Sequence, residues 1–491
     1  MPPAGPAHGT TPDVPTQLMG WGSNSAGQVT AGPAVLPLPV PVPGGLDFVD
    51  ASTGTNHSVA LAKDGRVWSW GANNSGQLGD GTDVSRTEPA PVPGLTDIVE
   101  VRAGSVFSVA LDSHGRVYSW GVNTSGRLGL GSVDAGRSTP TRIPSLGEIA
   151  QIDVSLAHVL ARRSDGTVWS WGSNLVGELG YGTAPYSAFP TMVPGLADVV
   201  DVAAGDVFSL ALRRDGTVSG WGSNAERQLG NADAGEIRLS PGYVAGPISG
   251  VADLEAGGDF VMVLLSDGTL RTWGSNVRGQ LGIHSPVGNA GAPAKLQIAR
   301  VTQISAARRS ALALTDDSRA YSWGVNALGI LGIGDLPTEM RAPTEITALP
   351  GGTVALASSG VGGHMLALRT DSPLFQVKLN PAAGTLVLPS GLAPAGAQAN
   401  TWVSIASVGS YRGSVTLKAT GLPPGIKATF SPPIVSSGES AQLTLSGVSL
   451  ETGPYTIAVT GTSAFPLKQV SATYTLTLAD SPPPAPDGPA G

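Results

Sequence analysis

The chain has 491 residues, of which 68 are glycine and 40 are proline, and only 13% are charged. Its net charge of −8 argues against a general nucleic-acid binder, because such proteins need a basic surface to displace counterions from phosphates. Cysteine is absent, which excludes thiol catalysis, thiolate metal sites and disulfides.

The chain begins with residues 1–15, which include five prolines and carry no strand pattern. We expect this segment to be disordered. It lacks a basic stretch followed by an apolar one, so no signal peptide is expected.

Residues 16–372 are built from a repeat, in which tryptophan, glycine, any residue and asparagine recur seven times at spacings of 49 to 52 residues. Glycine follows at the seventh position of six copies, and Arg227 holds it in the other. We predict that the tryptophans and asparagines are structural framework, since a buried indole removes about 150–250 Å² from water and asparagine bonds local backbone in turns. They are Trp21, Trp70, Trp120, Trp171, Trp221, Trp273 and Trp323, and Asn24, Asn73, Asn123, Asn174, Asn224, Asn276 and Asn326.

Each copy carries four short strand patterns. In the second copy, a run at 58–62 leads through Asp64-Gly65 to a run at 67–70, and a proline-rich segment precedes another run at 98–101. Asp-Gly between apolar runs predicts a hairpin, because glycine adopts the positive φ that such turns need. Four strands without a helical period predict one blade of an all-β propeller.

The array starts and stops at half copies. Residues 17–24 lack the hairpin that should precede them, and residues 354–370 lack the tryptophan strand that should follow. Because these halves complete each other, we predict seven four-stranded blades, closed into a ring by pairing of the N-terminal strand with the C-terminal ones.

The segment Gly54–Gly79, GTNHSVALAKDGRVWSWGANNSGQLG, resembles the regulator-of-chromosome-condensation repeat, and the resemblance covers residues 16–372. It implies a seven-bladed propeller that binds proteins. The family includes an exchange factor for the Ran GTPase, a plant photoreceptor, modules of ubiquitin ligases and a secreted bacterial β-lactamase inhibitor. Membership therefore does not select one partner.

Residues 373–480 alternate period-two runs with turns rich in proline, glycine and serine, which predicts an antiparallel β-sandwich. The stretch 413–432 resembles immunoglobulin-like modules of bacterial secreted and surface proteins. This resemblance implies an extracellular or cell-surface location in a bacterium, with the cytoplasm as the alternative. The proline-rich tail 481–491 is expected to be disordered.

Two sets of residues could suggest catalysis or metal binding. His57, His158 and His364 hold one equivalent position, but phenylalanine or serine holds it in the other copies, so we interpret them as core residues. Four aspartates belong to hairpin turns of separate copies, which explains them as turn residues rather than glycosidase pairs. They are Asp64, Asp165, Asp215 and Asp267. We expect no catalytic residue, metal or cofactor.

The two residues before the histidine or phenylalanine position vary freely among the copies, so specificity can reside there. In three consecutive copies they include Asp206, Asp259, Arg308 and Arg309, a charged sector on an otherwise neutral rim. We hypothesise that this sector contacts a partner. Ion pairs between blades, without a binding role, are the alternative.

These patterns predict a non-catalytic scaffold that binds a protein partner through the propeller rim, as an inhibitor or regulator of an enzyme. A guanine nucleotide exchange factor is the alternative. The exchange factor of the family has a protruding insertion in one blade, and the even spacing here leaves no room for one. A propeller hydrolase or lyase is a third hypothesis. We expect a monomer without nucleic acid or a membrane span.

Overall fold

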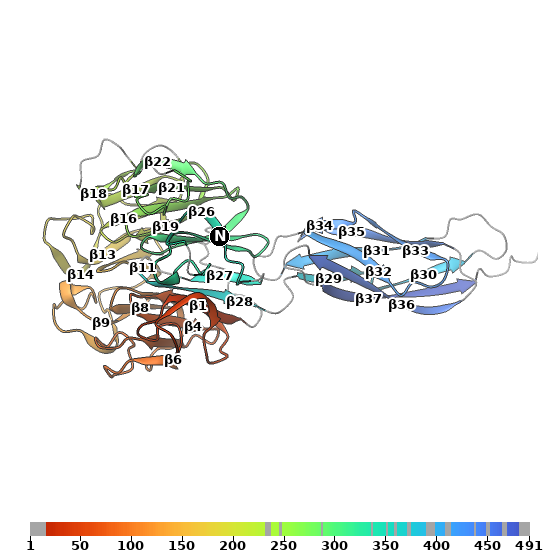
Figure 1. Ribbon diagram of the computed structural model, residues 1–491, viewed down its shortest axis with the longest axis horizontal. Coiled ribbons are helices and arrows are strands. Elements are labelled where there is room, and N and C mark those ends of the chain that lie inside the picture. The colour runs from red at the N-terminus through yellow and green to blue at the C-terminus, as the bar shows by residue number, and fades with distance from the viewer. Residues whose placement is uncertain are drawn as a thin grey trace, which may run out of the picture. The chain divides into compact units, whose positions relative to one another are not determined.

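The computed structural model describes residues 16–230, 237–244, 248–285, 288–334, 337–349, 352–357, 361–370, 375–388, 398–407, 414–436, 438–447, 452–463 and 469–480. The segments predicted to be disordered, 1–15 and 481–491, lie outside these residues. The chain divides into two compact units (Figure 1). The first comprises residues up to 370 except 316–318, and the second comprises 316–318 and the residues from 371 onward.

Six sheets of the first unit are formed by four strands that are consecutive in sequence and antiparallel. They are β3–β6 (Phe48–Thr53, His57–Ala62, Val67–Gly71, Arg86–Pro91), β7–β10 (Ile98–Ala103, Phe107–Asp112, Val117–Gly121, Arg137–Arg142), β11–β14 (Ile149–Val154, His158–Arg163, Val168–Ser173, Tyr186–Met192), β15–β18 (Val199–Ala204, Phe208–Arg213, Val218–Ser223, Ile237–Tyr243), β19–β22 (Val251–Ala256, Phe260–Leu265, Leu270–Gly274, Ala290–Lys295) and β23–β26 (Val301–Ala306, Ser310–Thr315, Ala320–Val325, Glu339–Glu345). The all-β prediction and the four-stranded antiparallel sheets are confirmed.

The seventh sheet of the described residues joins both ends of the unit, in the order β2-β1-β28-β27. Its strands are β1 (Gln17–Ser23), β2 (Val35–Pro41), β27 (Thr353–Ala357) and β28 (His364–Arg369). β1 and β28 are antiparallel, with Trp21 opposite Met365. The N-terminal strand thus pairs with the C-terminal ones, as the half copies of the repeat predict.

The repeat tryptophans connect neighbouring sheets. All seven are fully buried, and six donate their indole N–H to a backbone carbonyl of the preceding sheet at 2.9–3.0 Å. Trp70 is the exception, because its Nε1 is buried without a hydrogen-bond partner among the described residues. Each sheet therefore packs a large aromatic ring against its neighbour and in most cases anchors it with a hydrogen bond.

The repeat asparagines organise the loop after the third strand of each sheet. In all seven copies the side-chain Oδ1 accepts the backbone N–H of the residue five positions later, at 2.9–3.2 Å. Asn24, for example, also donates through Nδ2 to two backbone carbonyls of its loop. These bonds satisfy polar groups that the loop would otherwise bury.

Every outermost strand of the seven sheets contains proline. An outermost strand exposes unpaired backbone groups, and proline removes an N–H from that edge. The sequence shows the prolines before each new copy, and the structure places them where they interrupt the exposed edge.

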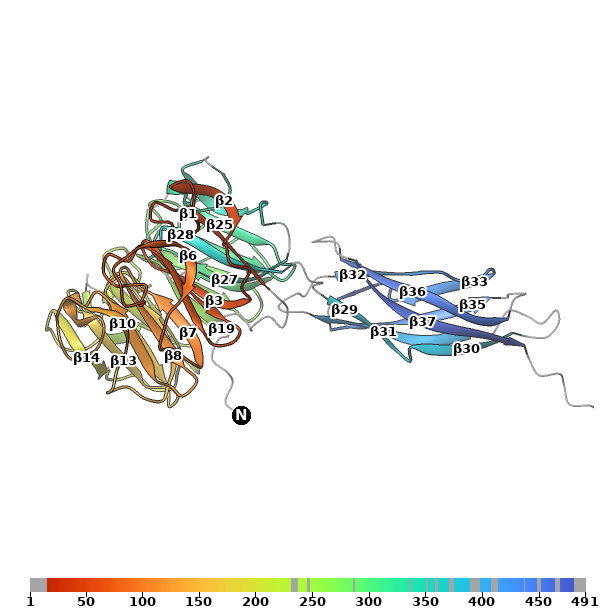
Figure 2. The same cartoon turned by 90° about the horizontal axis from the view of Figure 1, so that it is seen from below.

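The second unit contains two sheets with the orders β29-β31-β35-β33 and β30-β37-β36-β32-β34 (Figure 2). The strands are β29 (Phe375–Asn380), β30 (Ala383–Leu388), β31 (Gln398–Ser407), β32 (Ser414–Thr420), β33 (Ile426–Ser431), β34 (Ile434–Ser436), β35 (Ser440–Gly447), β36 (Gly453–Ser463) and β37 (Gln469–Asp480). Val403, Leu443, Ile457 and Tyr474 are among its buried residues.

One pairing in the second unit differs from the antiparallel prediction, because β30 runs parallel to β37. β29 and β30 are separated by only Pro381 and Ala382, yet they join different sheets. The period-two pattern predicts the run that forms β29, but it shows neither β30 nor the change of sheet between them. Within the described residues, no helix has the length and apolar character needed to cross a membrane.

Candidate protein-binding face

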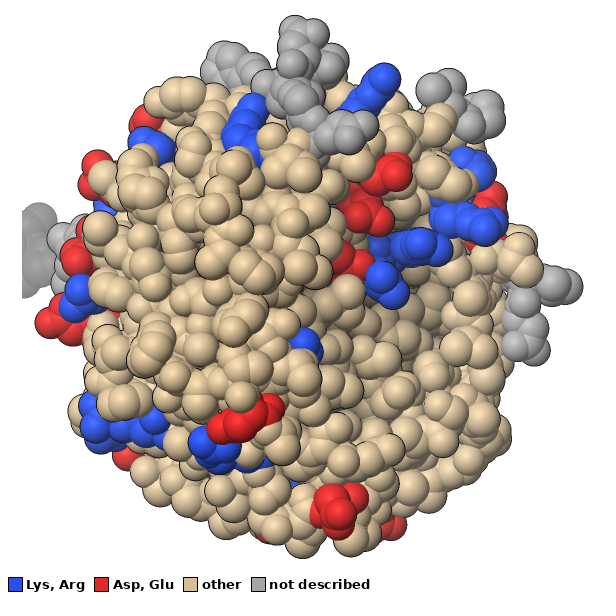
Figure 3. Space-filling model, turned by 90° about the vertical axis from the view of Figure 1, so that its left-hand side faces the viewer, with Lys and Arg blue, Asp and Glu red and all other residues tan. Residues whose placement is uncertain are grey.

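The variable residue pairs lie in the turns between the first and second strands of each sheet. Asp206 follows β15, Asp259 follows β19, and Arg308 and Arg309 follow β23. We call the side of the first unit that carries these turns and the asparagine loops the loop face. On the face seen in Figure 3, one cluster of acidic and basic side chains lies to the upper right of the centre, other charged groups lie nearer the edge, and most of the remaining surface is uncharged.

Backbone hydrogen bonds connect three of these turns across consecutive sheets. The Asp206 N–H donates to the carbonyl of Gly258 at 3.1 Å, and the Gly258 N–H donates to the carbonyl of Arg308 at 2.9 Å. The turns are therefore fixed relative to one another by their main chains. The side chains of these three turns therefore lie at fixed positions relative to one another.

Asp206 and Arg308 form an ion pair that spans the intervening sheet, with 2.7 Å between Arg308 Nε and Asp206 Oδ2. The Arg308 side chain passes beside Gly258, where an added Cβ would lie 2.9 Å from Arg308 Cγ and 3.2 Å from Asp206 Oδ2. The Asp206 side chain is 6% exposed and that of Arg308 is 54% exposed. A buried carboxylate thus holds an exposed guanidinium.

The charges of the sector perturb one another. Burial raises the pKa of Asp206 to about 6, against the lowering effect of Arg308. Burial and the nearby Glu226 raise the pKa of Asp259, and Arg308 and Arg309 oppose this rise. The four predicted residues therefore lie close enough for their charges to affect one another's pKa values. Only Asp206 and Arg308 form a direct pair, and the side chains of Asp259 and Arg309 have no ion pair among the described residues.

Several residues of this face were not singled out from the sequence. Glu226 lies in the loop after β17 and accepts a hydrogen bond from Asn289 Nδ2 at 2.6 Å. Leu175, Val277 and Leu328 occupy the tips of asparagine loops and are 76%, 57% and 54% exposed. The signal was present in the repeat, because the two residues after each asparagine vary as freely as the pairs before the histidine position.

Arg227 occupies the loop position that glycine holds in the other six copies, and its φ is +66°. At Gly27, an added Cβ would overlap Thr87 of the next sheet. Thr87 directly follows Arg86, the residue that pairs with Gly71. In the sheet β19–β22, Ala290 pairs with Gly274, so Gly291 holds the position that corresponds to Thr87 and faces Arg227. The missing glycine is therefore replaced by one on the facing strand.

The three histidines of the repeat are buried, and their Nε2 atoms contact serines of neighbouring sheets. The distances to Oγ are 3.0 Å for His57 and Ser108, 2.9 Å for His158 and Ser209, and 2.7 Å for His364 and Ser58. Burial lowers the pKa of His57 and His158 to about 4 and that of His364 to about 3. Neutral imidazoles thus link adjacent sheets.

The four turn aspartates lie in separate hairpins. Each accepts the backbone N–H of the residue two positions later, at 2.8–3.1 Å. The glycine after each has a φ between +77° and +82°. These contacts account for the Asp-Gly pairs as turn formers, so they do not form a carboxylate pair with a shared substrate position.

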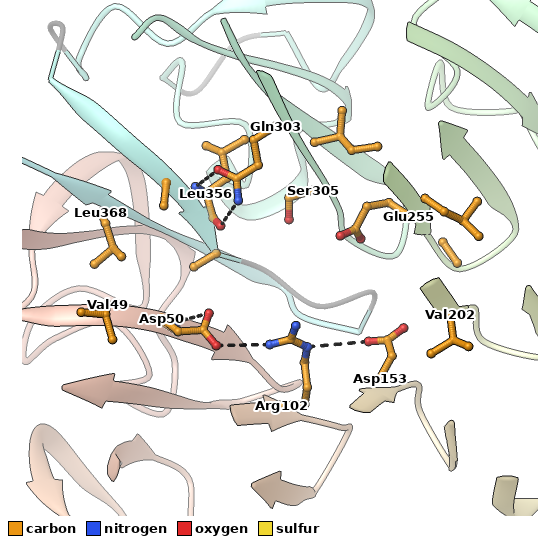
Figure 4. A pocket seen from close by; sticks show the side chains of 16 residues that line it. Val49, Asp50, Arg102, Asp153, Val202, Glu255, Gln303, Ser305, Leu356 and Leu368 are labelled. Atoms are coloured by element: carbon orange, nitrogen blue, oxygen red, sulfur yellow. Dashed lines mark hydrogen bonds and ion pairs between the residues drawn. The ribbon is translucent and has the colours of Figure 1, made fainter. Parts of the chain in front are cut away.

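The inner strands enclose a cavity that is lined by charged groups (Figure 4). Arg102 lies 3.3 Å from Asp50, 2.8 Å from Glu100 and 3.9 Å from Asp153. Burial raises the pKa of Glu100 to about 7 and that of Asp153 to about 6, although Arg102 lowers both. Among the described residues, no group of three His, Asp or Glu side chains is placed to hold a metal ion.

A model of the RCC1-like domain family matches residues 17–367. The human probable E3 ubiquitin-protein ligase HERC6 is 33% identical over 180 residues, which cover 34% of this chain and 18% of the ligase. Rat Alsin is 37% identical over 79 residues, which cover 16% of this chain and 5% of Alsin. The chain thus spans less than a fifth of each of these relatives.

Two solved structures have similar folds. Human WBSCR16 matches with a TM-score of 0.66 and 24% identity, over 73% of this chain and 99% of that one. Yeast RCC1 (Prp20), solved bound to Kap60, matches with a TM-score of 0.68 and 23% identity, over 74% of this chain and 91% of that one. Likeness at this identity shows the fold.

Proposed function

The chain belongs to the RCC1-like domain family, and on this premise we propose that it is a protein-binding propeller that holds its partner on the loop face. RCC1-like propellers serve protein interaction, and the yeast relative was solved with a bound protein. The fold alone does not choose a partner, so the argument rests on the residues of the face.

The proposal rests on the ion pair of Asp206 and Arg308 together with exposed apolar side chains at neighbouring loop tips of the loop face. The copies that contain Trp171, Trp221, Trp273 and Trp323 supply the ion pair and the exposed residues Leu175, Val277 and Leu328. The other copies have serine, threonine, asparagine or alanine at the equivalent loop tips, and their exposed apolar residues Val84 and Val133 lie further along the asparagine loops. Protein interfaces commonly combine apolar anchors with arginine, and charged groups steer and orient the partner.

The experiment is an affinity capture with three forms of the full chain: the wild type, the double variant Arg308→Ala and Arg309→Ala, and the control Arg66→Ala. Arg66 also pairs with an aspartate, but it lies in an exposed hairpin turn. A partner of the loop face is retained by the wild type and the control and is lost by the double variant. Equal retention by all three forms would exclude the charged sector as the binding site.

We also propose that the protein acts without catalysis, as a monomer, outside a bacterial cell or on its surface. The similarity of residues 413–432 to modules of bacterial surface proteins supports this location. Fractionation of the producing cells tests it, and recovery only from the cytoplasm would contradict it. Sedimentation tests the monomer. For the exchange-factor alternative, we expect the purified chain to leave nucleotide release from small GTPases unchanged.

A further inference from the structure

The Arg308 guanidinium is anchored through one of its three nitrogens. Its Nε binds Asp206 Oδ2 at 2.7 Å, and neither terminal nitrogen has a hydrogen-bond partner among the described residues. The side chain is 54% exposed. The two terminal nitrogens therefore remain available to a ligand from outside.

The anchoring has a fixed geometry. Asp206 is buried, its Oδ1 has no hydrogen-bond partner in the described part of the chain, and its backbone is held by Gly258. A buried carboxylate needs a compensating charge, so Arg308 is retained over it. Gly258 leaves the path open, since an added Cβ there would lie 2.7 Å from the Arg308 carbonyl oxygen.

We propose that Arg308, oriented by Asp206, binds a single carboxylate group of the partner protein through its two terminal nitrogens. A guanidinium presents these donors in a planar fork that matches the two oxygens of a carboxylate. Asp206 is a positioning residue, because it acts on the ligand through Arg308. This inference rests on the loop face being the protein-binding face, and it names the chemistry that the face recognises.

The surroundings favour an aspartate or glutamate side chain over a polyanion. Arg309 follows Arg308 in the same turn and adds a second positive charge without an ion pair of its own among the described residues. Glu226 and Asp259 lie close enough to influence each other, and a string of phosphates or acidic residues would meet them as well. Repulsion by these two carboxylates limits how much negative charge the site accepts.

The test uses the full chain and two blocked pentapeptides that differ in one residue, acetyl-Ala-Ala-Glu-Ala-Ala-amide and its glutamine counterpart. Binding is followed by the ¹⁵N resonances of the arginine side chains. We expect the glutamate peptide to shift the Arg308 resonances saturably and the glutamine peptide to leave them unchanged. Inorganic phosphate is the competing probe, and binding as tight as that of the glutamate peptide would overturn the proposal.

Three variants separate orientation from charge. Arg308→Lys keeps the charge but loses the fork, and Gly258→Ala keeps every charge but obstructs the side chain. We expect each to weaken binding of the glutamate peptide about tenfold, as for loss of one bidentate charge-assisted contact. Asp206→Asn should do the same and broaden the Arg308 Nε–H resonance, a change that simple loss of packing elsewhere would not produce.

Arg66→Ala is the matched control and should bind the glutamate peptide as the wild type does. Melting temperatures identify any variant that fails to fold, in which case Arg308→Lys decides alone because its side chain is exposed. Equal peptide binding by the wild type and Arg308→Lys would overturn this inference. A partner captured by the loop face would still support the proposed function, so the two failures are distinguishable.

Discussion

Trp21 donates its indole N–H to the carbonyl of Ile330 at 2.9 Å, across 309 residues of sequence. The bond joins β1 to the loop that follows β25, and β1 also pairs with β28. It shows that ring closure depends on a side-chain contact as well as on strand pairing.

Replacement of Trp21 by alanine should lower the free energy of unfolding of the propeller by about 3–5 kcal/mol, the usual range for a buried tryptophan. Deletion of residues 16–24 should have a larger effect, because it removes β1 and leaves β28 unpaired on one side. Calorimetry of the full chain measures both. The control is Trp402→Ala in the second unit, where the side chain is 55% exposed. An unchanged propeller transition after the deletion would contradict closure by β1.

The buried carboxylates on the first strands of the sheets predict that stability falls as pH rises from about 6.5 to 8. The pKa of Glu100 is raised to about 7, and those of Asp201 and Glu255 are raised well above their usual values. The folded state therefore binds protons that the unfolded state releases at lower pH, and this stabilisation is lost as pH passes the folded-state pKa. The buried histidines, whose pKa is lowered, act in the opposite sense only below about 6.5.

Urea unfolding at pH 6.5 and pH 8 measures this dependence. Glu100→Gln should reduce the difference between the two free energies of unfolding, because the amide carries no proton to lose. Arg102 keeps Asp50 as an ion-pair partner in this variant. A wild-type protein that is more stable at pH 8 would contradict the prediction.

The histidine position predicts that two similar substitutions have different effects. Phe107 requires glycine three residues earlier, because a Cβ at Gly104 would overlap its ring. Gly54 precedes His57 in the same way, so His57→Phe should fold and should lose less stability between pH 6.5 and 4. Ser155 precedes His158 and lies 2.7 Å from its Nδ1 through Oγ, so His158→Phe should clash.

Thermal unfolding at pH 7 compares these two variants directly. We expect His57→Phe to stay near the wild type and His158→Phe to lose about 1–3 kcal/mol, as for overpacking of a core. Equal losses would show that the preceding residue does not decide which side chain is accepted.

The positions of Arg227 and Gly291 predict that substitutions at these two residues compensate each other. Arg227→Gly should stabilise the propeller by about 1–2 kcal/mol, because a non-glycine residue in the left-handed region is strained. Gly291→Thr alone should destabilise it, since the new Cβ meets Arg227. The double variant recreates the pairing of Gly27 with Thr87 and should recover the stability. Chemical denaturation of all four forms gives the coupling energy, and a value near zero would contradict the pairing.

The repeat predicts the sheets and the strand that closes the ring, because a buried tryptophan and a glycine turn impose the same local structure in every copy. The ion pair of Asp206 and Arg308 could not be derived from it. That contact joins sheets that are not adjacent, and it depends on the missing side chain at Gly258. The sequence identified the charged turns but not their geometry.

The sequence pattern also did not predict the cluster of buried carboxylates on the inner strands. Glu100, Arg102 and Asp153 lie on first strands whose polar residues resemble those of an ordinary exposed strand face. Only the closed ring turns them toward a shared interior, where Arg102 lies within 3.9 Å of several carboxylates. Their raised pKa values follow from this enclosure, which period-two patterning does not describe.

The proline in each outermost strand has a consequence for how the molecule can meet other molecules. A strand of a neighbouring molecule cannot extend these sheets through an uninterrupted ladder of main-chain hydrogen bonds. Propellers at high concentration are therefore protected from associating through the edges of their outermost strands. Contacts of these edges with other molecules therefore depend on side chains, which differ from one sheet of the propeller to the next.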